Sequence, residues 1–145
     1  MSPATKLIIV IVGLLSIAYA VWYFLPWSMS HRENMMQSGS LNIPQFSAIA
    51  LQGREIFNEN CAKCHGENAI GTNQGPPLLH NIYNPGHHGD NSFLRATESG
   101  VRQHHWPFGD MPQQPQVDKD QVFSIVRYIR ELQEANGIFY QRHQM

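Results

Sequence analysis

The stretch Cys61-Ala62-Lys63-Cys64-His65 decides how this sequence of 145 residues is interpreted. Its two cysteines are the only ones in the chain, and they are too close together to form a useful structural disulfide. Two chemistries suit such a pair, namely a redox-active dithiol and covalent haem attachment. The histidine directly after the second cysteine favours haem, because the thiols can add to the vinyl groups as thioethers while the adjacent imidazole binds the iron.

Two alternatives to haem can be weighed on the sequence. A thioredoxin-like dithiol expects a βαβ setting, and the chain has no alternating strand pattern. A zinc site expects further cysteines or histidines at metal-ligand spacing. We therefore expect one covalent haem c, attached through Cys61 and Cys64, with His65 as an axial ligand of the iron.

The charge composition disfavours several other functions. The chain has 10 Lys and Arg residues against 11 Asp and Glu residues, so no strong field favours nucleic acid or an acidic substrate. It also lacks a basic run, a Gly-rich phosphate loop and a paired-carboxylate motif. We therefore expect no nucleic-acid partner. For a haem whose iron is held by two protein ligands, we also expect no small-molecule substrate, and an electron-transfer protein rather than an enzyme.

Residues 7–27 read LIIVIVGLLSIAYAVWYFLPW and contain no charge. A helix needs about 20 apolar residues to cross a bilayer, and Trp22 and Trp27 belong to the aromatic class that favours the membrane interface. The alternative is a cleavable signal peptide that begins with Lys6 and ends near Ala20. Because the apolar run continues past Ala20, we expect a retained single transmembrane helix.

The chain divides into three parts by composition. Residues 1–27 form the predicted anchor, residues 28–47 are polar and read as a tether, and residues 48–145 form the predicted domain. In an alternative use of the tether, Ile43 and Phe46 pack part of it on the domain.

The first predicted helix of the domain begins near residue 48 and runs into Cys61. The residues expected on one face of this helix recur at helical spacing, namely Ile49, Gly53, Ile56, Phe57 and Asn60. Residues 66–91 are rich in Gly, Pro and Asn and predict loop. A short helix is expected over residues 90–99, with Asp90 as its N-cap and Gly100 as its stop.

The last helix has the clearest signals. Asp118 is its expected N-cap, Gln121 stands in the capping-box position, and Gly137 ends it. Its apolar stripe consists of Val122, Ile125, Val126, Ile129 and Leu132. Three prolines within residues 104–116 exclude a regular helix before it. The predicted domain is all-α, built from helices and loops.

Residues 48–137 resemble a class I c-type cytochrome, and the whole chain resembles a membrane-anchored monohaem member. The matching residues are Gly53 and Phe57, eight and four positions before Cys61, Tyr128 on the last helix, and the loop Gly75-Pro76-Pro77-Leu78. The resemblance implies the small class I cytochrome c fold, here preceded by one N-terminal transmembrane helix. It also implies that Gly53 permits a close crossing by the last helix, and that Phe57 packs on that helix. Pro76 would accept a hydrogen bond from His65 Nδ1–H and so orient the imidazole.

Met111 is the expected second axial ligand. It is the only Met after the haem motif and inside the domain, in a loop with Pro107 and Pro112 on either side. The axial Met of the family lies in such a loop, and a thioether ligand raises the reduction potential. As an alternative, Met111 fills a gap in the core.

The eight histidines leave other possibilities open. His104 or His105 could replace Met111 as the ligand. His80, His87 and His88 could form a second metal site, although adjacent loop histidines are more often exposed or hydrogen-bonded. Trp106 and Phe108, which follow His105, are expected to wall the haem.

The resemblance implies an electron carrier between respiratory-type partners, such as a quinol-oxidising complex, an oxidase or a dehydrogenase. In bacteria this type of haem is attached outside the cytoplasmic membrane, so we expect a single-pass protein whose haem domain faces the periplasm. One alternative is a permanent haem c subunit of a larger membrane oxidoreductase. Another is a haem sensor or small peroxidase with a labile sixth ligand.

Overall fold

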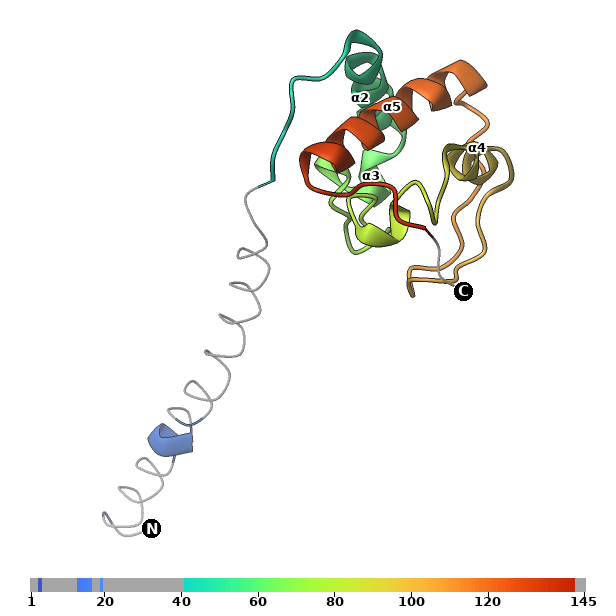
Figure 1. Cartoon of the computed structure of the whole chain (residues 1–145). Coiled ribbons are helices and arrows are strands. Elements are labelled where there is room, and N and C mark those ends of the chain that lie inside the picture. The colour runs from blue at the N-terminus through green and yellow to red at the C-terminus, as the bar shows by residue number, and fades with distance from the viewer. Residues whose placement is uncertain (1–2, 4–12, 17–18, 20–40, 143–145) are drawn as a thin grey trace. The chain divides into compact units, whose positions relative to one another are not determined.

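The computed structural model describes residues 3, 13–16, 19 and 41–142 (Figure 1). The predicted anchor over residues 7–27, its signal-peptide alternative and most of the tether therefore lie largely or wholly outside the described residues. Among the residues that are described, no helix is long and apolar enough to cross a membrane. The chain divides into two units at residues 41 and 42, and the second unit carries the haem motif.

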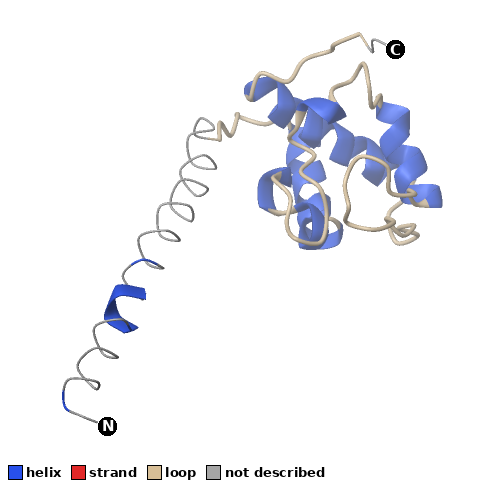
Figure 2. Ribbon diagram, turned by 90° about the horizontal axis from the view of Figure 1, so that it is seen from below, coloured by secondary structure: helices blue, strands red, loops and turns tan. Residues whose placement is uncertain are grey.

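The second unit is made of helices joined by loops (Figure 2). Over residues 41–142 the structure has no strand, and its one isolated β-bridge joins Val101 to Met111. The prediction of an all-α domain is confirmed for this part of the chain. In chain order the elements are α2 (Ala48–Asn60), α3 (Ala62–His65), the 3₁₀ turns η1 (Glu67–Ala69) and η2 (Asn81–Tyr83), α4 (Asp90–Ser99) and α5 (Lys119–Ala135).

The helix α2 buries a slightly different face from the one predicted. Ala50, Gly53, Ile56 and Phe57 are buried, whereas Ile49 remains 47% exposed. The prediction for Ile49 was wrong because the first turn of α2 presents Ala50 to the neighbouring helix instead. The Ser47 hydroxyl caps this turn by accepting the Ala50 N–H at 3.3 Å.

The helix α5 begins as predicted. The Asp118 side chain accepts the N–H of Gln121, and the Gln121 side chain accepts the N–H of Asp118, both at 2.9 Å. This reciprocal pair satisfies two backbone donors that a helix start otherwise leaves unpaired. The predicted cap of α4 was wrong, because Gly89 occupies the N-cap position and the Asp90 carboxylate accepts a hydrogen bond from Arg130 of α5.

Helices α2 and α5 cross each other (Figure 1). Their backbones are in close contact at Gly53. A Cβ atom on Gly53 would overlap the carbonyl of Ser124 and lie 2.8 Å from the backbone nitrogen of Ile125. The expectation that Gly53 permits a close crossing is therefore confirmed. A glycine in a helix interior costs about 1 kcal/mol relative to alanine, and the close backbone approach is what requires it here.

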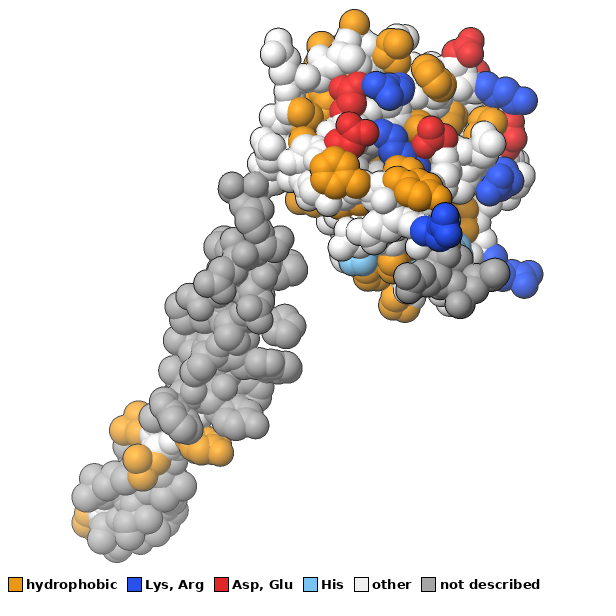
Figure 3. All heavy atoms as spheres, in the orientation of Figure 1, with side chains coloured by type: hydrophobic (Ala, Val, Ile, Leu, Met, Phe, Trp, Pro, Cys, Tyr) orange, Lys and Arg blue, Asp and Glu red, His pale blue; other side chains and the backbone are white. Residues whose placement is uncertain are grey.

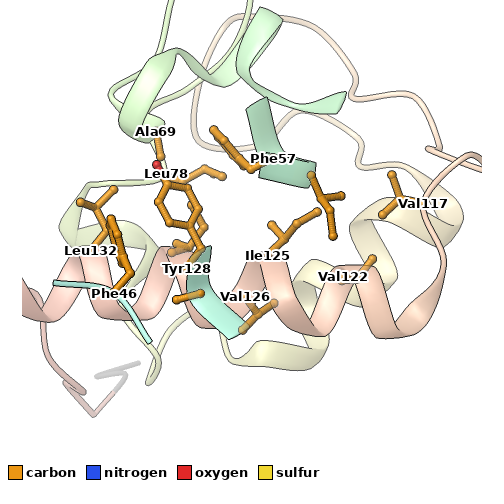
Figure 4. Packing of buried hydrophobic residues seen from close by; sticks show 13 residues of the cluster. Phe46, Phe57, Ala69, Leu78, Val117, Val122, Ile125, Val126, Tyr128 and Leu132 are labelled. Carbon is orange, nitrogen blue, oxygen red and sulfur yellow. The ribbon is translucent and has the colours of Figure 1, made fainter. Parts of the chain in front are cut away.

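The core lies around this crossing. The Tyr128 ring packs between Phe46 and Phe57, with ring centroids 5.2 and 5.5 Å away (Figure 4). Tilted aromatic pairs at such separations contribute about 0.5–1.5 kcal/mol beyond their buried area. Phe46 comes from the segment before α2 and packs on the domain, as the alternative use of the tether expected, whereas Ile43 of the same segment remains 41% exposed.

Gly53→Ala should destabilise the domain. The new methyl group has to push α5 away, and overpacking of this kind costs about 1–3 kcal/mol. Because the overlap is with backbone atoms, the upper end of this range applies. Alanine recovers about 1 kcal/mol of helix propensity, so we expect a net loss of about 2 kcal/mol in the free energy of unfolding. Urea unfolding of the holoprotein measures the loss. Gln52→Ala, at the neighbouring exposed position, is the control; equal stabilities of the two variants would contradict the close crossing.

Candidate functional site

A cavity of about 660 Å³ lies between α2, α4, α5 and the loop that precedes α5. Ligand sites in proteins typically occupy about 300–1,000 Å³. Of the five residues predicted to hold the haem, four line this cavity, namely Cys61, His65, Pro76 and Met111. Cys64 is exposed and does not belong to the lining.

The haem motif follows directly from the end of α2. The N–H of Cys61 bonds to the Phe57 carbonyl at 2.8 Å and closes α2. The N–H of His65 then bonds to the Cys61 carbonyl at 2.9 Å, within the short helix α3. The two cysteines and the histidine are thus held on one continuous turn of backbone, at a position set by α2.

The His65 imidazole is oriented by the loop that follows. Its Nδ1 lies 2.9 Å from the Pro76 carbonyl oxygen, and because a carbonyl can only accept, Nδ1 carries the proton. This leaves the lone pair on Nε2, the form that binds a metal. Burial lowers the pKa of His65 while the bond to Pro76 opposes the shift, so the imidazole is neutral at pH 7.

The loop that carries Pro76 folds back on the motif. The Thr72 hydroxyl donates to the Cys64 carbonyl at 2.6 Å, and the Thr72 N–H donates to the Gly75 carbonyl at 3.0 Å. A Cβ on Gly75 would lie 2.9 Å from the Cys64 carbonyl oxygen, which explains the glycine. Thr72 was missed by the sequence analysis, because nothing in its neighbourhood signals the contact.

The loop over residues 101–111, here called the Met111 loop, is closed at its base by backbone hydrogen bonds. Val101 and Met111 exchange two backbone hydrogen bonds of 2.9 Å each. Further along, the Asp110 carboxylate accepts the Gln103 N–H and the Gln103 amide oxygen accepts the Gly109 N–H, both at 2.9 Å. These bonds give the loop a fixed shape and place Met111 on the cavity wall.

Trp106 also lines the cavity, as the sequence predicted for a haem wall. Its indole Nε1 is buried, and in the described part of the chain no acceptor meets it in good hydrogen-bond geometry, although the Tyr83 side chain lies nearby. Buried donors are almost always paired, so this N–H suits a ligand that brings an acceptor into the cavity. The two carboxylates of a haem are acceptors of this kind.

The alternatives to haem fit the cysteines poorly. A redox-active dithiol needs a lowered thiol pKa, whereas burial and the neighbouring Cys64 raise the pKa of the Cys61 thiol to about 11. Among the described residues, the group of side chains arranged to hold a metal ion consists of histidines and includes neither cysteine. Thioether formation is the chemistry that remains.

Comparison with known families decides the class. A model of the family described as cytochrome c matches residues 50–133, which is more than half of the chain. The chain belongs to the cytochrome c family. No curated protein and no solved structure matches it. The cofactor of this cytochrome is a single covalently bound haem c, and its chemistry is haem-based electron transfer.

A buried arginine on α5 forms hydrogen bonds with the segments of this cytochrome that precede α4. Arg130 of α5 donates to the Tyr83 carbonyl and to the Gln133 side chain at 2.7 Å each, and also to the His88 carbonyl. Its Nε forms a 2.9 Å ion pair with Asp90 at the start of α4. The sequence does not identify Arg130 as a buried residue, because a charged side chain beside an apolar stripe usually faces solvent.

The Arg130 bonds fix the loop between η2 and α4 against α5. The Gln133 side chain adds a 2.8 Å bond to the Leu78 carbonyl. Leu78, Tyr83 and His88 all line the cavity, so this pair of polar side chains positions one of its walls.

Arg130→Met should destabilise the holoprotein by about 2 kcal/mol, because it leaves the part-buried His88 carbonyl and the buried Gln133 amide oxygen without this donor, while the Tyr83 carbonyl keeps only its bond from Gln133. The ion pair adds little, since the Asp90 side chain is 68% exposed. The control is Arg127→Met, which removes an exposed i,i+4 pair with Glu131 and should cost about 0.3–0.5 kcal/mol. Urea unfolding compares the two, and similar costs would rule out the proposed role of Arg130.

Proposed function

We propose that this cytochrome is a membrane-anchored monohaem carrier of single electrons between respiratory-type redox partners. In this proposal Cys61 and Cys64 hold the haem through thioethers, and His65 and Met111 are the two axial ligands of the iron. The observation that carries the proposal is that one cavity receives both His65, with its Nε2 lone pair available, and Met111.

Two protein ligands leave the iron no open position, which disfavours substrate chemistry and favours outer-sphere electron transfer. The haem, when bound, supplies a reversible one-electron couple. The chain sets the conditions for that couple. Pro76 increases the donor strength of His65 through the Nδ1–H bond. The Met111 thioether favours the ferrous state, and Phe57, Leu78 and Ile125 supply apolar walls that exclude water.

The membrane assignment rests on residues 7–27, whose length and aromatic end suit a retained anchor. Because haem c in bacteria is attached outside the cytoplasmic membrane, we place the haem domain in the periplasm and the amino terminus inside. The proposed partners are a quinol-oxidising complex, an oxidase or a dehydrogenase. The anchor would confine the search for these partners to the plane of the membrane.

The surface charge bears on how such partners are met. On the face shown in Figure 3, acidic and basic side chains of the cytochrome domain are interspersed. With a net charge of −1 for the whole chain, long-range steering is weak, and an anchor that confines the search to the membrane compensates for it.

Met111→Ala should keep the haem attached and open the iron to added ligands. Loss of the thioether should lower the reduction potential by an amount on the order of 0.1 V, within the roughly 0.8 V range that axial ligands control. Redox titration and carbon monoxide binding to the reduced protein measure both effects.

His104→Ala is the control for the alternative ligand in the same loop, and it should leave the potential unchanged. Carbon monoxide binding by the reduced, unmodified protein at neutral pH would instead support a sensor or peroxidase with a labile sixth ligand. It would contradict the proposal that Met111 is an axial ligand of the iron.

The anchor should retain the full-length protein in the membrane fraction after a high-salt wash, and mild detergent should release it as a haem protein. Removal of residues 1–27 with a cleavable leader in their place should move the haem protein to the soluble periplasmic fraction. A full-length protein found in the soluble fraction would contradict the anchor. Stoichiometric co-purification of other redox chains would decide for a permanent oxidoreductase subunit.

A further inference from the structure

Four histidines from two separate loops meet at the cavity wall. His87 and His88 follow η2, while His104 and His105 lie near the tip of the Met111 loop. Their rings lie close together, with centroids 4.3 Å apart for His104 and His105 and 5.2 Å apart for His88 and His105. The proposed haem ligation uses none of these imidazoles, so their convergence needs another explanation.

Three of these histidines are spaced as metal ligands. One ring nitrogen from each of His87, His88 and His105 lies within 4.8 Å of the others. The Nε2 atoms of His87 and His105 are 3.3 Å apart. Two nitrogens bound at 2.0–2.1 Å to a tetrahedral ion are separated by about 3.3–3.4 Å, so this pair already has the required spacing.

The orientation of His88 is fixed in the way that a metal ligand requires. Its Nδ1 lies 2.8 Å from the Ile82 carbonyl oxygen and must therefore donate, which leaves the lone pair on Nε2. Histidines that bind metals almost always donate their other N–H to a carbonyl or carboxylate in this manner. Burial lowers the pKa of His88, and the neighbouring imidazoles lower it further, in keeping with a neutral ring.

The backbone on both sides is also held in place before any ion arrives. The Asn84 carbonyl accepts the N–H of His87 at 3.1 Å and that of His88 at 2.9 Å. Arg130 donates to the carbonyl of His88 from the other side. On the opposite loop, the bonds of Gln103 to Asp110 and Gly109 shape the turn that presents His105.

We propose that His87, His88 and His105 form a binding site for a divalent transition-metal ion of the Zn²⁺ or Cu²⁺ class, which bridges the two loops. Imidazole nitrogen is a ligand that these ions prefer, whereas Mg²⁺ and Ca²⁺ prefer oxygen. Three ligands leave a fourth position for water. His104 stands beside the site, with its Nδ1 bonded to the Arg102 carbonyl at 2.8 Å.

The experiment uses the full-length holoprotein in detergent, titrated with Zn²⁺ in a calorimeter. We expect one equivalent to bind. In His105→Gln the affinity should fall by more than the ~10–100-fold that loss of a mere outer-shell partner costs. Because His105 is exposed, this variant should fold, which its circular dichroism and haem spectrum verify.

The matched control is His80→Asn, which also removes one histidine but lies outside the cluster. Asn can still accept the Ile82 N–H that His80 Nδ1 accepts at 3.2 Å, so zinc affinity should be unchanged. A second ligand variant, His88→Gln, should lose affinity as His105→Gln does.

Electron paramagnetic resonance of the Cu²⁺ form, recorded with the haem oxidised and with the spectrum of the copper-free ferric protein subtracted, should show hyperfine coupling to imidazole nitrogens that His105→Gln reduces. Mg²⁺ should give no binding heat.

The proposal is overturned if Zn²⁺ does not bind in stoichiometric amount or binds equally well to His105→Gln. It is also overturned if Cu²⁺ shows only oxygen ligands, as haem carboxylates would supply. A haem spectrum altered in His105→Gln without metal would mean that His105 serves the iron instead.

Discussion

The backbone contact between α2 and α5 at Gly53 is the constraint on which the rest of the domain depends. It lets the two helices approach until the glycine meets the backbone of Ser124 and Ile125. Because α2 ends at Asn60 and the haem motif begins at the next residue, the crossing also sets where His65 can stand. A side chain at position 53 would therefore move the site as well as loosen the core.

The same crossing places the side chains of α5 that control the loops. Tyr128 fills the space between Phe46 and Phe57. Further along the same helix, Arg130 and Gln133 donate hydrogen bonds to backbone carbonyls of the segments before α4. The carbonyl groups of a loop have no partners of the kind that a helix or a sheet provides. Side-chain donors from the rigid helix α5 supply the hydrogen bonds instead. The cavity walls are in this way fixed by polar contacts as much as by apolar packing.

Local features of the domain could be predicted from the residue pattern, whereas tertiary features could be predicted only where the family resemblance implied them, as for the close crossing at Gly53. The capping box of Asp118 and Gln121 is a contact between residues three apart, so the pattern alone predicts it. The error at Asp90 has the opposite origin. Its carboxylate is a good cap by type, but Arg130, which is 40 positions away, binds it instead.

The candidate site divides in the same way. The haem motif, Pro76 and Met111 were identified by residue type and by resemblance, and the structure gathers Cys61, His65, Pro76 and Met111 around one cavity. The meeting of His87 and His88 with His105 depends on how two irregular loops approach each other. No periodicity records such an approach, which is why the sequence left the loop histidines open between solvent exposure and a second metal.

The Met111 loop connects the two proposed sites mechanically. Its base, the bridge between Val101 and Met111, lies in the cavity wall, and His105 lies near its tip. An ion that joins His105 to His88 would tie the tip to a loop that Arg130 already holds against α5. The conformation that keeps Met111 at the cavity would then also be the one that binds the ion. Two binding events that favour one conformation are thermodynamically coupled, and the coupling is reciprocal. Metal at the tip would strengthen thioether ligation at the base, and a bound thioether would raise the affinity for metal by the same factor.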